Sequence, residues 1–174
     1  KDSIFWGDSG PLRNGKGSCY EGGYRLPCIV RWPGKVPAGQ ESAAIFASVD
    51  FMPTFAKLCG FEIPNDRRID GIDQTGLLLG KRKTGRDYFY FNNAGVRKGK
   101  WKYLRANAYF HGYAVEKDRA KVEELYDLEA DLGERNNLAE KYPEEVAELK
   151  ALMSSIEGKN SGTPSSTPNG RSKK

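Results

Sequence analysis

The stretch Gly10-Pro-Leu-Arg-Asn-Gly-Lys-Gly-Ser-Cys-Tyr-Glu-Gly-Gly-Tyr-Arg-Leu-Pro-Cys-Ile-Val-Arg-Trp-Pro-Gly34 carries the strongest structural signals in this chain. Up to Gly23 it is rich in glycine and has neither helical nor strand periodicity, which predicts a loop. The apolar run within Tyr24 to Trp32, closed by Pro33 and Gly34, predicts a buried strand. We therefore expect a loop that leads the chain into a core.

Helix signals follow downstream of this strand. Asp50 is a plausible N-cap, apolar residues recur at helical spacing from Phe51 to Leu58, and Gly60 ends the pattern. A turn and cap at Asp70 to Asp73 precede a short helical run, Gln74 to Leu79. These helices are expected to pack on the strand and to complete a first unit, residues 1–80.

The second half of the chain predicts a small antiparallel sheet covered by a helix. Three aromatic segments, 87–91, 96–105 and 123–128, are typical of strands with one covered face. A helix is predicted from Pro143 to Gly158, where Gly158 ends it. Its apolar stripe comprises Val146, Leu149, Leu152, Met153 and Ile156. We expect a second unit at 81–158 and a disordered basic tail at 159–174.

Charge and hydropathy exclude several classes of protein. The net charge is +5, but Lys159, Arg171, Lys173 and Lys174 carry four of these charges. Residues 1–158 hold 24 basic and 23 acidic side chains, a net charge of +1, so no nucleic-acid partner is expected. No stretch approaches the roughly 20 apolar residues that cross a bilayer, so no membrane span is expected. The sequence at Lys1 does not resemble a signal peptide.

Cysteine and histidine usage argues against self-contained hydrolytic chemistry. The three cysteines, Cys19, Cys28 and Cys59, have neither CxxC nor metal-ligand spacing. The single histidine, His111, would have to build a catalytic triad or a metal site alone. We therefore predict no metal site within these residues.

Five ordered segments resemble landmarks of one enzyme family, the type I sulfatases of the arylsulfatase-like group. The first is the quoted stretch, and the others are Val49 to Thr54, Asp70 to Asp73, Gly99 to Tyr103, and Leu125 to Leu128 with Glu134, Asn137 and Leu138. The resemblance covers roughly residues 7–157. It implies an α/β fold of the alkaline-phosphatase-like type, seen here as an α+β portion: the end of a large domain, then a small antiparallel sheet with a C-terminal helix.

The resemblance also implies a mechanism whose main groups lie upstream. In this family a formylglycine, made from a C/S-x-P-x-R motif, attacks sulfur, the alcohol leaves, and sulfate is then eliminated. No such motif occurs here, and the ligands of the family's divalent cation, usually calcium, also lie upstream. We therefore expect this portion to act with the N-terminal remainder of the same sulfatase on a sulfate ester, and to be inactive alone.

The site residues expected within this chain lie in the glycine loop. Lys16 occupies the position where the family places a lysine against the sulfate, and its ammonium would stabilise charge on the sulfuryl group. Ser18 and Glu21 are expected to support it. Arg13 either binds substrate or pairs with an acid, and Arg25 has the same two possibilities.

Three further residues or segments have weaker expectations. His111 is expected to border the substrate cleft, and Asp8 is more plausibly a loop residue than a metal ligand. The basic cluster at 97–105 alternates with Trp101 and Tyr103, which favours an amphipathic strand over a polyanion site.

Two alternative functions stay open. One is a phosphonate or phosphate monoester hydrolase of the same superfamily, and the other is a non-catalytic relative that binds anionic glycans. The family and the absence of an Asn-x-Ser/Thr sequon suggest a periplasmic or secreted bacterial protein.

Overall fold

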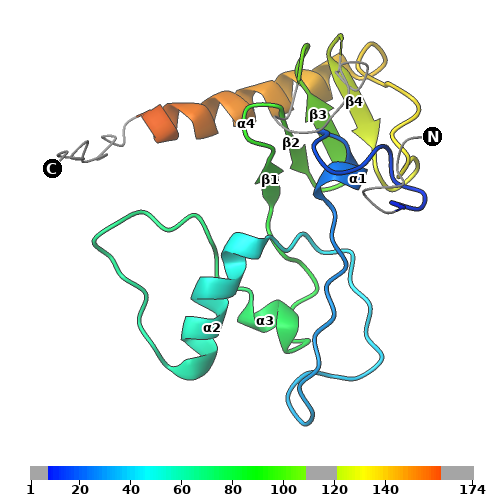
Figure 1. The fold of residues 1–174 in the computed structure, drawn as a ribbon. Coiled ribbons are helices and arrows are strands. Elements are labelled where there is room, and N and C mark those ends of the chain that lie inside the picture. Colours follow the sequence, from blue (N-terminus) through cyan, green and yellow to red (C-terminus); the bar gives the residue numbers. More distant parts are fainter. Residues whose placement is uncertain (1–7, 109–120, 162–174) are drawn as a thin grey trace, which may run out of the picture.

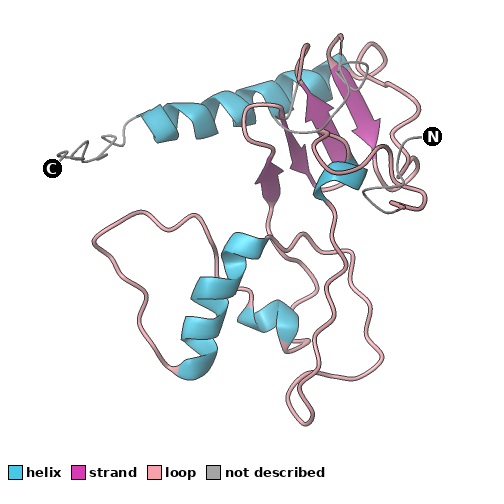
Figure 2. Cartoon of the chain, in the orientation of Figure 1, coloured by secondary structure: helices cyan, strands magenta, loops and turns pink. Residues whose placement is uncertain are grey.

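The computed structural model describes residues 8–108 and 121–161, and Figure 1 shows two regions. The upper region contains helix α1 (Glu21–Tyr24), the sheet and helix α4 (Pro143–Ser161). The lower region contains the 3-10 turn η2 (Ser48–Asp50) and helices α2 (Phe51–Cys59) and α3 (Thr75–Leu78). Long irregular segments connect the helices of the lower region (Figure 2).

The sheet is antiparallel, as expected, but has four strands in the order β1-β2-β3-β4. Its strands are β1 (Tyr88–Tyr90), β2 (Gly95–Lys98), β3 (Trp101–Leu104) and β4 (Glu124–Asp127). The prediction of one strand at 96–105 is wrong, because Gly99 has a left-handed φ of 56° and reverses the chain into a hairpin.

Both faces of the sheet are covered, which corrects the prediction of a single covered face. One cross-strand row comprises Tyr90, Val96, Tyr103 and Leu125, and it packs against α4. The row on the opposite face comprises Phe89, Arg97, Lys102 and Tyr126, on the side covered by residues 19–24. Residues 19–24, at the end of the glycine-rich stretch, are thus part of the packed core.

Helix α4 covers its face with the predicted apolar stripe. Val146, Leu149, Met153 and Ile156 are buried, and Leu152 is half-buried. The acidic residues Glu144 and Glu145 lie in its first turn, where they complement the helix dipole. The helix runs to Ser161, so Gly158 does not end it, and residues 159–161 belong to the helix and not to a tail. The rest of the expected tail lies outside the described residues.

Asp50 organises the lower region from the N-terminus of α2. Its buried carboxylate accepts hydrogen bonds from the amides of Ala47 and Ile72, both at 2.9 Å, and from the Arg86 guanidinium at 2.7 Å. It therefore joins three segments instead of capping α2 with its side chain. The expected end of α2 is confirmed, since Gly60 has a φ of 74°.

The predicted buried strand within Tyr24 to Trp32 is wrong for the structure described. Tyr24 ends α1, and the following segment pairs with no strand among residues 8–108 and 121–161. Leu26 and Ile29 are consequently 83% and 94% exposed. An apolar segment is buried only where a partner covers it, and none of the described elements does so.

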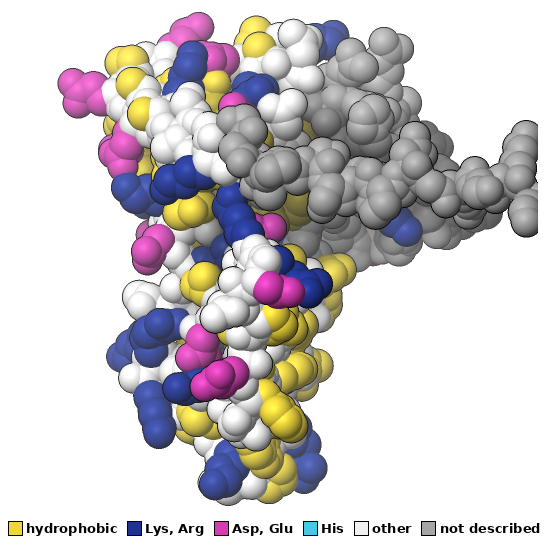
Figure 3. Space-filling view, turned by 90° about the vertical axis from the view of Figure 1, so that its left-hand side faces the viewer, with side chains coloured by type: hydrophobic (Ala, Val, Ile, Leu, Met, Phe, Trp, Pro, Cys, Tyr) yellow, Lys and Arg dark blue, Asp and Glu magenta, His cyan; other side chains and the backbone are white. Residues whose placement is uncertain are grey.

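Exposed apolar side chains gather in the lower region. Among the described residues, ten of the twelve large hydrophobic residues that are exposed lie between Leu26 and Ile72. Figure 3 shows hydrophobic side chains at the surface of the lower part of the molecule. We call this set the apolar surface: Leu26, Ile29, Val30, Trp32, Val49, Met52, Phe55, Phe61, Ile63 and Ile72. Within the described residues, no helix is long and apolar enough to span a membrane.

The Asp50 contacts predict a pH-dependent contribution to stability. Burial opposes ionisation of Asp50, but the hydrogen bonds from Arg86 and two amides outweigh it and lower its pKa from the ordinary 3.8. Its stabilisation is therefore present above about pH 4 and is lost as the pH falls through the lower folded-state pKa. Asp50→Asn is expected to cost about 3 kcal/mol at pH 7, and less in acid, in urea unfolding of the intact protein.

The matched control is Asp66→Asn, because Asp66 pairs with Arg67 on the exposed surface. That change is expected to leave the free energy of unfolding nearly unchanged, because solvent screens exposed ion pairs. An Asp50→Asn penalty that is the same at pH 7 and pH 3 would contradict the assignment.

Candidate functional site

Lys16 lies on a loop, residues 10–18, whose backbone is tied down at several points. The amide of Ser18 donates to the carbonyl of Gly15 at 3.1 Å, and the amide of Gly22 donates to the carbonyl of Arg13 at 3.0 Å. Gly17 has a φ of 93°, which favours glycine. The Lys16 side chain itself is exposed. The structure thus presents an ammonium group on a loop of defined shape, which we call the lysine loop.

Gly22 and Gly23 explain how the lysine loop lies so close to α1. A Cβ atom on Gly22 would lie 2.1 Å from the carbonyl oxygen of Asn14, and one on Gly23 would lie 2.3 Å from that of Ser18. No side chain fits in either place. The Glu-Gly-Gly sequence is therefore required by direct contact between backbones.

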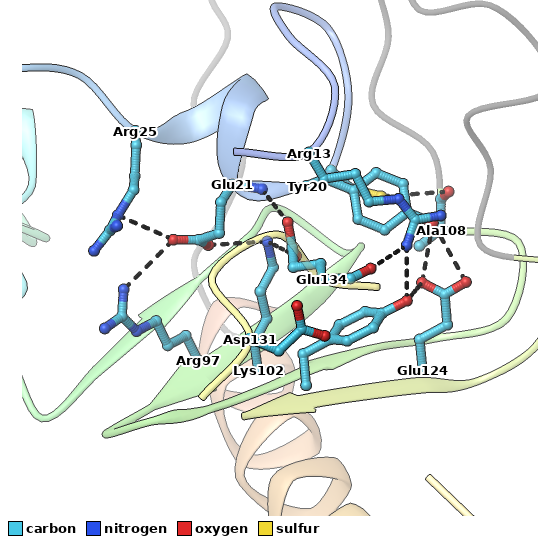
Figure 4. Close-up of polar contacts among 12 residues, drawn as sticks. Arg13, Tyr20, Glu21, Arg25, Arg97, Lys102, Ala108, Glu124, Asp131 and Glu134 are labelled. Carbon is cyan, nitrogen blue, oxygen red and sulfur yellow. Dashed lines mark hydrogen bonds and ion pairs between the residues drawn. The ribbon is translucent and has the colours of Figure 1, made fainter. Parts of the chain in front are cut away.

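Glu21 is buried, and it contacts a lysine other than Lys16. Lys102 of β3 lies 3.0 Å from Oε1 of Glu21 and 2.8 Å from Oε1 of Glu134 (Figure 4). The other oxygen of Glu134 accepts a hydrogen bond from the Glu21 amide at 2.6 Å. All three side chains are at most 2% exposed. We call Glu21, Lys102 and Glu134 the buried charge cluster.

Two arginines complete the electrostatics around Glu21. Arg25 and Arg97 lie 3.1 Å and 3.6 Å from its second oxygen, Oε2. Arg25 therefore pairs with an acid, one of the two roles that the sequence left open. Burial raises the pKa of Glu134, although Lys102 and the Glu21 amide favour its charged form.

Arg13 also makes contacts inside the protein. Its Nη1 donates to the carbonyl of Glu134 at 2.7 Å and to the hydroxyl of Tyr126 at 2.9 Å, and its guanidinium lies 3.7 Å from the centre of the Tyr20 ring. Glu124 accepts hydrogen bonds from both tyrosines, at 3.0 Å and 2.9 Å. Arg13 thus fastens the start of the lysine loop to the sheet, and substrate binding by Arg13 stays a prediction.

The other expected site residues have varied surroundings. Ser18 is buried against Gly23, and its hydroxyl has no hydrogen-bond partner among the described residues. The exposed Asp8 carboxylate accepts a hydrogen bond from the Gly10 amide at 2.8 Å, as a loop residue does. His111 lies outside the described residues, so its role stays a prediction.

The basic side chains of the cluster at 97–105 form ion pairs with carboxylates. Lys98, Lys100 and Arg105 pair with Glu148, Asp127 and Glu157 respectively. The amphipathic-strand interpretation is wrong for Lys100, which lies in the turn between β2 and β3, and for Lys102, which is fully buried. Among the described residues, these carboxylates offset the positive charge of the cluster, which weakens the support for the anionic-glycan alternative.

Potential nucleophiles and metal ligands are sparse in the described part of the chain. Cys19 is buried beside the carbonyl of Ala108, and burial raises its pKa to about 11, so the reactive thiolate is disfavoured. No group of three His, Cys, Asp or Glu side chains could hold a metal ion within residues 8–108 and 121–161.

Lys102 and Glu134 are the functional candidates that sequence reasoning missed. Alternation along 96–105 placed Lys102 on a solvated face, because no local pattern shows that residues 19–24 cover that face. One signal was available: Glu21, Lys102 and Glu134 lie in three different sequence landmarks. Their shared location could not be derived from spacing alone.

Comparison with known proteins gives one consistent relationship. Residues 14–159 match the family described as N-sulphoglucosamine sulphohydrolase, C-terminal. The chain is 38% identical over 154 residues to an N-acetylgalactosamine-6-O-sulfatase of Bacteroides thetaiotaomicron, covering 84% of this chain and 30% of that protein. It is 32% identical over 170 residues to arylsulfatase A of Bos taurus, covering 87% and 33%.

Solved structures agree with this relationship. A Bacteroides thetaiotaomicron structure, reported with the metabolism of multiple glycosaminoglycans, has a TM-score of 0.72 at 36% identity and covers 85% of this chain and 32% of that chain. Ps i-CgsB, solved with k-i-k-neocarrahexaose, has a TM-score of 0.66 at 25% identity and covers 84% and 32%. The chain spans about a third of the length of these relatives.

The close backbone contact predicts a sharp difference between two glycine substitutions. Gly22→Ala should destabilise the intact protein by about 1–3 kcal/mol, because backbone atoms must move to admit the methyl group. Gly158→Ala is the control: it lies within α4, a Cβ there meets no atom within 4 Å, and alanine favours helix. Thermal unfolding measures both, and equal stability of the two variants would refute the contact.

Proposed function

We propose that this chain, which belongs to the sulfatase family and matches its C-terminal part, works within an enzyme that hydrolyses sulfate esters. The family match over residues 14–159 is the observation that carries the proposal. A carbohydrate sulfate is the favoured substrate class, because the relative at 38% identity is named as an N-acetylgalactosamine-6-O-sulfatase. The formylglycine nucleophile would lie outside these 174 residues.

Lys16 is the residue of this chain to which we assign direct contact with substrate. Its ammonium carries three donors, and an ammonium beside a sulfate offsets the charge that develops on the sulfuryl oxygens. The geometry of the lysine loop supports this role, because hydrogen bonds and left-handed glycines define the path of its backbone. A defined loop presents the cation with little loss of entropy on binding.

Sulfatases use a metal ion in general, and we propose that the intact enzyme uses calcium. The described residues do not fit such an ion, since they contain no suitable group of ligands. Calcium would neutralise sulfate oxygens and favour ionisation of the nucleophile. Its ligands would come from outside residues 8–108 and 121–161.

The apolar surface is the proposed contact with the N-terminal remainder of the same protein. The relatives are about three times as long as this chain, and the family match is C-terminal, so the relatives contain a large further region that could make this contact. The surface includes the segment from Leu26 to Trp32 and a groove lined by Pro53, Phe61 and Ile63. Many exposed large apolar side chains in one region are typical of a surface that a partner covers.

The role of Lys16 can be tested in the intact enzyme. Lys16→Met should lower kcat/KM for a sulfate ester by about 10²–10³-fold, because a donor to the developing charge is lost. Thermal stability should not change, since the side chain is exposed. Lys83→Met, at another exposed lysine, is the control.

Paired substrates separate the competing functions. N-acetylgalactosamine 6-sulfate and 4-nitrophenyl sulfate should be hydrolysed by the intact wild-type protein, and 4-nitrophenyl phosphate much more slowly. Faster phosphate hydrolysis would favour the phosphatase alternative. Full activity of Lys16→Met would remove Lys16 from the site.

If the apolar surface contacts another part of the protein, a carboxylate introduced within this surface should destabilise the protein. A carboxylate at an exposed aliphatic residue elsewhere should not. Ile29→Glu should lower the yield and melting temperature of the intact protein, because burying Ile29 stabilises by about 1.5–3 kcal/mol and a buried unpaired carboxylate adds a further cost. Val122→Glu is the control, since Val122 is also exposed but lies outside the apolar surface. Equal melting temperatures for the two variants would refute the contact.

A further inference from the structure

The buried charge cluster is the most unusual feature of the upper region. Lys102 is fully buried with two carboxylates, Glu21 and Glu134, and its ammonium also lies 4.6 Å from the centre of the Phe91 ring. Removing three charged groups from water is costly, and an apolar core of similar volume is often as stable. Stability alone therefore gives little reason for ions at this place.

Glu134 contacts both ends of the segment that contains Lys16. Its carbonyl accepts a hydrogen bond from the Arg13 guanidinium at 2.7 Å, and its carboxylate accepts one from the Glu21 amide at 2.6 Å. Arg13 and Glu21 lie on opposite sides of Lys16 in the sequence. A single residue from the segment between β4 and α4 thus contacts the chain on both sides of Lys16.

The backbone of Glu134 is strained where it makes these contacts. Its φ of 50° lies in the left-handed region, which costs a non-glycine residue about 1 kcal/mol or more. Glycine would relieve this strain but would lack the carboxylate. The conformation allows the carbonyl of one residue to bind Arg13 in the lysine loop while its side chain binds the Glu21 amide in α1.

We infer that Lys102 and Glu134 are positioning residues, which act through the lysine loop to place the Lys16 ammonium for the sulfate ester. Lys102 pairs with both Glu134 and Glu21, and Glu134 contacts Arg13 within the lysine loop and the Glu21 amide just after it. Neither residue is a catalytic residue, because both are buried among protein groups and Lys16 is the group presented at the surface. The inference rests on the proposed function, since it assigns these residues to the same site.

A double-mutant cycle in the intact enzyme tests this inference. Lys102→Met should lower kcat/KM for N-acetylgalactosamine 6-sulfate by about 10²-fold, because a displaced loop misplaces Lys16. In a Lys16→Met background the same change should cost less than about threefold, because no ammonium is left to misplace. Lys102→Arg should recover part of the activity, since it restores a cation.

Asp50→Asn is the matched control for simple loss of stability. It breaks another buried ion pair, Asp50 with Arg86, away from the lysine loop. Its effect on kcat/KM should be the same with and without Lys16, measured at a temperature where each variant is folded. A Lys102→Met effect that is equally independent of Lys16 would overturn the inference.

Hydrogen exchange separates this inference from the proposed function. The amides of residues 13–23 should exchange at least tenfold faster in Lys102→Met than in wild type, and unchanged protection would overturn the inference whatever the activity. If wild type hydrolyses no sulfate ester while loop protection still falls, the proposed function fails and the loop-holding role stands.

A milder variant covers the possibility that Lys102→Met does not fold. Glu134→Gln keeps an oxygen for the Glu21 amide and removes the charge that pairs with Lys102. It should reduce kcat/KM by about tenfold, again only when Lys16 is present. An equal reduction without Lys16 would count against the inference.

Discussion

The buried charge cluster of Lys102, Glu21 and Glu134 is the constraint on which the upper region depends. It joins the sheet, α1 and the loop before α4 at one buried point. Charged groups that lose water must be satisfied by each other, so their positions are set more narrowly than those of apolar neighbours. The same requirement orders the lysine loop, because Glu134 contacts Arg13 within the loop and Glu21 three residues after it.

The two regions differ in how far they are stabilised by their own contacts. The sheet is covered on both faces and pairs its surface charges locally, so its apolar side chains are buried. The lower region relies on Asp50 and Arg86 and leaves much of its apolar area uncovered. This contrast supports the proposed contact between the apolar surface and a further part of the protein.

Sequence reasoning succeeded where the signal was local. The stripe of α4 and the glycine that ends α2 follow from periodicity and from backbone freedom, and the structure confirms both. It failed where distant contacts override the local pattern. Lys102 alternates with aromatic residues as a solvated lysine would, yet it is buried because residues 19–24 lie over that face. The apolar run around Ile29 predicts a buried strand, yet Ile29 is exposed because no described strand pairs with its segment.

By itself the sequence determined the family, the order of the main helices and the identity of the candidate cation, Lys16. Those conclusions depend on residue types and spacings that are read along the chain. Only the tertiary structure decided that Glu21 pairs with Lys102, that Glu134 contacts the chain on both sides of Lys16, and that both faces of the sheet are covered. The physical reason is that a buried charge selects its partner by proximity in space, and Glu21, Lys102 and Glu134 are brought together only by folding.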